Sequence, residues 1–149
     1  MTKDILLSIS GLQFDPSHMD QECIEVITAG NYYNRNGKHY ILYDEVSEDT
    51  DEITKNTIKI SDNQIDILKN GVTRAHMVFR ENEKNMSYYN TPFGQLLIGI
   101  NTNKIEITKE DHSINVSIDY ALEMNYEHVS DCKISFQAKS KEMTNLKLN

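Results

Sequence analysis

The amino-acid sequence predicts an all-β protein, a single antiparallel up-and-down β-barrel of about eight to ten strands. Three observations lead to this prediction. About ten runs of residues alternate apolar and polar side chains or are rich in β-branched residues. Tight-turn signals separate these runs, and no segment keeps the apolar spacing of an amphipathic helix. Closure into a barrel also removes the exposed sheet edges that such a chain must manage.

Two Asn-Gly pairs mark the first hairpins. Asn36-Gly37 and Asn70-Gly71 both favour the positive φ angles of a two-residue type I′ turn. Consecutive hairpins of this kind indicate a meander rather than Greek-key crossovers. The strands that these turns are predicted to join are residues 24–33 and 39–43 for the first hairpin, and 65–68 and 72–80 for the second.

The second half of the chain carries the clearest alternation. A turn is predicted at Thr91-Pro92-Phe93-Gly94, with proline and glycine where a β-turn favours them. Apolar residues occupy every second position in four runs: residues 75–79, 96–100, 114–122 and 132–138. We therefore expect one continuous buried inner surface that includes Met77, Phe79, Ile98, Ile118, Tyr120, Ile134 and Phe136.

Length and charge limit the classes of function. A chain of 149 residues suits one barrel domain, residues 1–149, with residues 141–149 expected to fray. The net charge of −8 disfavours nucleic acid and anionic membranes as partners. No apolar stretch resembles a signal peptide or a membrane span, and only two cysteines occur, Cys23 and Cys132. We expect a cytoplasmic protein with reduced thiols.

Metal and catalytic motifs are missing from the sequence. Six acids in residues 44–52 could hold a hard cation, but the order and the glycine of a calcium loop are absent, so a solvated loop is favoured. The five histidines are at least sixteen residues apart, and no zinc, phosphate-loop or nucleophile motif occurs. We expect Cys23 to be a small buried apolar residue rather than a nucleophile. No metal, cofactor or catalytic residue is predicted.

The eight tyrosines are more informative. Tyr32-Tyr33 and Tyr88-Tyr89 are adjacent pairs on predicted strands, so one member of each pair should face the interior. Several inward tyrosines would give a cavity with apolar walls and a few hydroxyl groups, which is typical of a ligand pocket. A filled barrel with tyrosines reaching its rim is an equal alternative.

Several segments resemble one bacterial family. Residues 38–45 are similar to its Tyr-x-x-Tyr-x-Glu strand, and residues 89–94 to its Tyr-x-Thr-Pro-Tyr-Gly turn, with Phe93 in place of the second tyrosine. Residues 57–60 and 118–122 resemble further strands, and residues 68–71 followed by 77–79 resemble its central hairpin. The family is the YwiB-like proteins, and the resemblance covers about residues 24–138. It implies a cytoplasmic calycin-like, or lipocalin-like, barrel, but no activity and no catalytic residue. The chain has no tryptophan and so lacks the Gly-x-Trp of true lipocalins.

The leading hypothesis is a binding protein for a small, partly apolar and acidic molecule. The candidate ligand-binding residues are Tyr43, Tyr89 and Tyr120, with Arg74 near the mouth to hold a carboxylate. Tyr120 shares its face with Ile118, whereas Arg74 would reach the interior only through a bulge near Gly71. Two alternatives are a protein-interaction domain and an enzyme at the barrel mouth, whose candidate groups are Glu45, Lys59, Arg74 and His76. The oligomeric state and the ligand are not given by the sequence.

Overall fold

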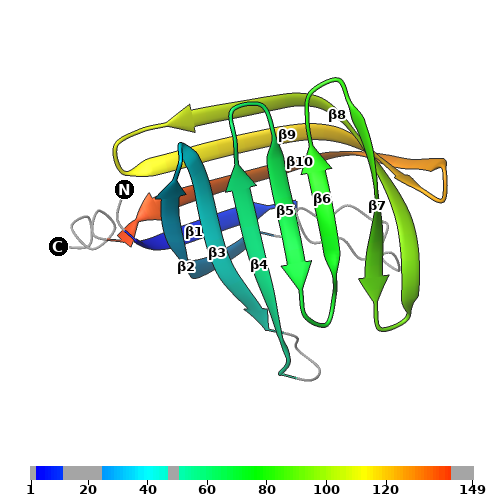
Figure 1. The fold of residues 1–149 in the computed structure, drawn as a ribbon, viewed down its shortest axis with the longest axis horizontal. Coiled ribbons are helices and arrows are strands. Elements are labelled where there is room, and N and C mark those ends of the chain that lie inside the picture. The colour runs from blue at the N-terminus through cyan, green and yellow to red at the C-terminus, as the bar shows by residue number, and fades with distance from the viewer. Residues whose placement is uncertain (1–2, 12–24, 47–50, 142–149) are drawn as a thin grey trace.

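Ten strands form a single antiparallel sheet in the computed structural model, which describes residues 3–11, 25–46 and 51–141. The sheet curls into a nearly closed barrel (Figure 1). The predicted fold class and strand number are therefore confirmed. The strands are β1 (Asp4–Ser10), β2 (Glu25–Arg35), β3 (Lys38–Val46), β4 (Ile53–Ile60), β5 (Ile65–Asn70), β6 (Ala75–Phe79), β7 (Lys84–Thr91), β8 (Gly94–Lys109), β9 (Ser113–Met124) and β10 (Glu127–Ser140).

The strands follow one another around the barrel, with a single seam. Every strand pairs with its neighbour in sequence except β6 and β7, and β1 pairs with β10. At the seam, Arg74 and Asn90 exchange two backbone hydrogen bonds of 2.8 and 2.9 Å. The Ser87 hydroxyl adds a hydrogen bond of 2.6 Å to the carbonyl oxygen of His76. The barrel is thus closed between β6 and β7 by one bridge and one side chain in the described residues.

The longest strand, β8, bends around one side of the barrel (Figure 1). Its pairing with β9 shifts register between Thr102 and Lys104. A bulge of this kind increases twist and bends a strand, which lets one strand of sixteen residues follow the curvature.

The core lies inside the barrel, where alternate residues of each strand point. All seven predicted core residues are buried, which confirms the period-two interpretation of the sequence. Isoleucine dominates this interior, and its branched side chains pack well on a pleated surface. The residues confirmed are Met77, Phe79, Ile98, Ile118, Tyr120, Ile134 and Phe136.

Two of the predicted turns have the expected geometry. Asn36 and Gly37 join β2 to β3 with φ angles of 54° and 78°, as a type I′ turn requires. Thr91 pairs with Gly94 across the next predicted turn, and Gly94 adopts a φ of 140°. Both turns are therefore two-residue connections between paired strands, as the sequence predicts.

The prediction of a two-residue turn at Asn70-Gly71 is wrong. The strands around it do pair antiparallel, but residues 71–74 all lie between β5 and β6. Gly71 does not adopt a positive φ; it packs instead on the start of β4, where an added Cβ would lie 2.5 Å from the Thr54 Cα. The Thr54 hydroxyl also accepts a hydrogen bond of 3.2 Å from the Val72 N–H. Because of this contact with β4, the connection between β5 and β6 has four residues instead of two.

The barrel has two ends, which we name after a residue in one turn of each. At the Pro92 end lie residues 71–74, 92–93 and 125–126, together with the last residues of β3. At the Gly37 end lie residues 36–37, 61–64, 80–83 and 110–112. Cys23, most of the predicted frayed tail and the middle of the acidic segment fall outside the described residues.

Candidate functional site

Three tyrosines from three strands converge inside the barrel. Tyr43 on β3, Tyr89 on β7 and Tyr120 on β9 are each less than a tenth exposed. Tyr89 acts electrostatically on both of the others, so the three hydroxyl groups share one region. The Tyr120 ring also packs edge-on against Phe79, with ring centroids 5.2 Å apart. The structure therefore brings together all three tyrosines that the sequence analysis selected.

Burial keeps the phenols of Tyr43 and Tyr120 neutral. It raises the pKa of Tyr43, and the neighbouring Glu45 and Tyr89 raise that pKa further. Burial also raises the pKa of Tyr120, with added contributions from Cys132, to which Tyr120 is hydrogen-bonded, and from Tyr89. A neutral phenol can both donate and accept a hydrogen bond. We name Tyr43, Tyr89 and Tyr120 the tyrosine cluster. Their rings form an apolar surface, and their hydroxyl groups can form hydrogen bonds.

A second group of polar side chains lies on the inner face beside the tyrosine cluster. Lys69 on β5 places its Nζ atom 3.0 Å from Glu45 Oε1 and 3.1 Å from Asn56 Oδ1. Asn56 donates a hydrogen bond of 3.4 Å to the same Glu45 oxygen. Lys69 and Asn56 are buried, and Glu45 is two residues from Tyr43 on the same face of β3. We call Lys69, Glu45 and Asn56 the lysine cluster.

The sequence analysis did not select Lys69 or Asn56. The signal that would have found them is the alternation itself, since Ile65, Ile67 and Lys69 share one register. The same alternation along β4 puts Asn56 in register with Ile58. When every second residue of a strand faces the interior, a polar residue at the next such position also faces the interior.

Arg74, the cation that the sequence analysis proposed for the site, is exposed. It lies directly before β6, where Ala75 and Met77 face the interior, so Arg74 is on the outward register. Its backbone forms the bridge to Asn90. Arg74 is therefore near the Pro92 end, as expected for a rim residue, but its side chain is not among the tyrosines.

The charged residues of the enzyme hypothesis do not gather at one mouth. Glu45 faces inward, but His76 and Lys59 lie on outward registers of β6 and β4. The His76 imidazole is 2.7 Å from Asp66 Oδ2, and the Lys59 ammonium lies over the Tyr40 ring. The structure thus divides these groups between the two faces of the sheet.

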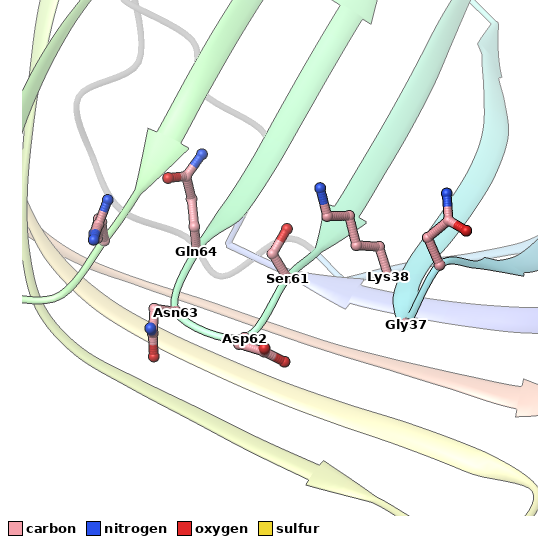
Figure 2. Close-up of a pocket in the computed structure, with 8 residues that line it drawn as sticks. Gly37, Lys38, Ser61, Asp62, Asn63 and Gln64 are labelled. Atoms are coloured by element: carbon pink, nitrogen blue, oxygen red, sulfur yellow. The ribbon is translucent and has the colours of Figure 1, made fainter.

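The Gly37 end of the barrel carries a surface cleft of about 360 Å³ (Figure 2). Lys38 and Arg80 bring positive charge to it, Asp62 brings negative charge, and the rest of the lining is mainly amide and hydroxyl groups. Figure 2 shows the Lys38, Ser61 and Gln64 side chains projecting to the same side of the ribbon. The cleft is separate from the tyrosine cluster, because none of its lining residues belongs to that cluster.

A half-buried histidine lies on the inner face near the same end. Its Nδ1 atom is 2.6 Å from the Tyr32 hydroxyl, and the two rings stack with centroids 5.8 Å apart. Burial lowers the pKa of this residue, His39, and the positive charge of Lys109 lowers it further. Burial raises the pKa of Tyr32, and a hydrogen bond with Asn34 partly offsets that rise. Both partners are therefore held in their neutral forms.

The described residues contain neither a metal-ligating cluster nor a membrane-spanning helix. Among residues 3–11, 25–46 and 51–141, no three His, Cys, Asp or Glu side chains gather closely enough to hold a metal ion. No helix in that part of the chain has the length and apolar character needed to cross a membrane. Cys132 is half-buried, with its Sγ atom 3.2 Å from the Ser130 hydroxyl oxygen.

Comparison with known proteins supports the fold. A family model described as "Domain of unknown function (DUF1934)" matches residues 8–136. The ywiB protein from Bacillus subtilis has a similar crystal structure, with a TM-score of 0.76 and 23% sequence identity. That match covers 93% of this chain and 92% of the other. No curated protein matches the sequence significantly.

Proposed function

Because the chain belongs to the DUF1934 family of YwiB-like proteins, whose description names no activity, we propose a function from the interior of the barrel. The proposed function is the binding of a small, partly apolar molecule that carries an acidic group. The observation that carries it is the convergence of Tyr43, Tyr89 and Tyr120 in one buried region. Ligand sites typically combine apolar walls with a few placed polar groups.

The proposed ligand would enter from the Pro92 end. The tyrosine rings would contact its apolar body, and their hydroxyl groups would orient it by hydrogen bonds. Arg74 is assigned to the rim, where an exposed guanidinium can attract an anion on approach. We place this activity in the cytoplasm, supported by the low cysteine content.

Thermal stability measured with a panel of small carboxylates and fatty acids tests this function. A ligand at about 100 times its Kd should stabilise the protein by about 2.7 kcal/mol. For a domain of this size that corresponds to a Tm increase of roughly 5–10 °C. Tyr120→Phe should reduce the shift, whereas Tyr126→Phe, at a residue that is 74% exposed, should not.

A native mass spectrum of the protein purified from cells provides the second test. A bound small molecule of defined mass would support the proposal. Absence of any shift with the panel, together with a spectrum showing only the bare chain or a stoichiometric protein partner, would overturn it.

A further inference from the structure

Lys69 is an uncommon residue to find inside a barrel. Its side chain is 6% exposed, although lysine is among the residues least often buried. The ammonium occupies the inner register that Ile65 and Ile67 begin, one residue before the end of β5. Removing a charge from water is costly unless partners replace the lost hydration. The position of Lys69 therefore depends on the groups that its ammonium contacts.

The contacts of Lys69 use two of its three N–H donors. A lysine ammonium has three N–H donors, and two acceptors lie within hydrogen-bond distance among the described residues, Glu45 Oε1 and Asn56 Oδ1. A third acceptor is needed for a fully satisfied buried ammonium. The third N–H of Lys69 can thus make the first contact with another oxygen atom, before either partner moves.

The two charges of the cluster differ in burial. The Lys69 side chain is 6% exposed, whereas the Glu45 side chain is 37% exposed. A half-exposed carboxylate can turn toward water at modest cost, because water replaces the hydrogen bonds that it gives up. A buried ammonium has no such alternative. Of the two, Glu45 is the partner that another anion can replace.

We infer that Lys69 is the cation that holds the acidic group of the ligand, and that Glu45 is an internal carboxylate that competes with the ligand for it. The inference rests on the proposed function and names the ligand class: a monocarboxylate with an apolar body. It assigns the charge recognition to Lys69 rather than to Arg74.

Charge and neighbours favour a monocarboxylate over a phosphate. One ammonium matches one negative charge, and a second negative charge would face Glu45 without a cation of its own among the cluster residues. The neutral hydroxyl of Tyr43 supplies a further donor on the same face. One Asn56 N–H bonds the Thr54 carbonyl oxygen, and the other, which bonds Glu45, is released when Glu45 turns away. The adjoining tyrosine cluster supplies the apolar contact for the rest of the ligand.

The experiment compares fatty acids with alcohols of the same chain length. Octanoate, decanoate and dodecanoate are titrated against octanol, decanol and dodecanol by calorimetry. The wild type should prefer each acid by at least about tenfold, as one charge-assisted hydrogen bond supplies about 1.5–3 kcal/mol and 1.4 kcal/mol is tenfold. Lys69→Met, which keeps the aliphatic stem, should abolish that preference. Lys133→Met, the same change at an exposed lysine on the outer face of β10, should keep it.

Glu45→Gln gives the sharpest result. If Glu45 competes with the ligand, its removal should tighten acid binding by about tenfold and leave alcohol binding unchanged. If Glu45 only supports the site, acid binding should weaken or stay the same, which would overturn the inference. The double variant Glu45→Gln/Lys69→Met carries no charge in the cluster, so it guards against a single variant that fails to fold. It should bind acids and alcohols equally.

The outcomes separate the inference from the function on which it rests. Equal binding of acids and alcohols by the wild type, or an acid preference that survives Lys69→Met, would overturn the role of Lys69 and leave the binding function standing. Binding of none of the six compounds would overturn the role of Lys69, and together with a native mass spectrum that shows no bound small molecule it would overturn both.

Discussion

Truncation of Phe136 tests the packing of the barrel interior. Its side chain is 3% exposed and lies in register between Ile9 on β1 and Val116 on β9. Loss of a fully buried phenylalanine side chain removes about 1.5–3 kcal/mol of transfer free energy. The cavity left by the ring adds a further cost, because neighbours on two paired strands can relax only partly. Phe136→Ala should therefore lower the free energy of unfolding by about 3–5 kcal/mol.

The assay is urea unfolding followed by circular dichroism, with Lys133→Ala as the matched control on the same strand. Lys133 is exposed on the opposite face of β10, and its truncation should cost under about 0.5 kcal/mol. For Phe136→Ala the midpoint should fall at an unchanged slope. Its Tm should drop by roughly 6–20 °C. Similar losses at both positions would refute the assignment of inner and outer faces.

Two glycines should respond differently to alanine, and one histidine should set a pH dependence. Gly71→Ala should destabilise by more than about 2 kcal/mol, because its Cβ would lie 2.5 Å from the Thr54 backbone. In Gly37→Ala the added Cβ meets no atom within 4 Å, so the variant should lose about 1 kcal/mol from its φ of 78° alone. A larger loss in Gly37→Ala than in Gly71→Ala, measured by denaturant unfolding, would contradict the turn geometry. The pKa of His39 is lowered on folding, so the unfolded chain binds its proton first as pH falls below about 6.5. The free energy of unfolding should therefore decrease from pH 7 toward pH 5, and His39→Gln should flatten that decrease; an unaltered pH profile in the variant would refute the assignment.

The strands were predictable because one face of each must be apolar. Alternation in residues 114–122 identified an inner face that the structure confirms through Ile118 and Tyr120. It could not place Tyr43 and Tyr89 with equal certainty, since both registers of their strands carry apolar groups. Their inward orientation is decided by pairing with neighbouring strands, which a single sequence does not encode locally.

Tertiary contacts explain what the sequence did not predict. Asn70-Gly71 has the composition of a tight turn, but contact with Thr54, sixteen residues earlier than Asn70 in the chain, extends the connection. Lys69 reads as a surface residue by type, and only its register and the distant Glu45 explain its burial. In both cases a partner on another strand stabilises the observed arrangement, although the inward register of Lys69 follows from the alternation along β5.

The order of strands around the barrel has a consequence for how the chain folds. Because consecutive strands pair on either side of the seam between β6 and β7, residues 25–79 and 84–140 can each assemble as a local meander. Contacts between distant parts of the chain are concentrated in the β1–β10 ladder, where Ile5 lies opposite Ser140. A circularly permuted chain, joined between β10 and β1 and opened in residues 80–83, would turn every ladder of the sheet into a sequential hairpin. The bridge between Arg74 and Asn90 and the hydrogen bond from Ser87 to His76 would become long-range, but they are fewer than the pairs of the β1–β10 ladder that become local. Such a chain would keep the same ladders with a lower contact order, and we expect it to fold faster than the natural chain.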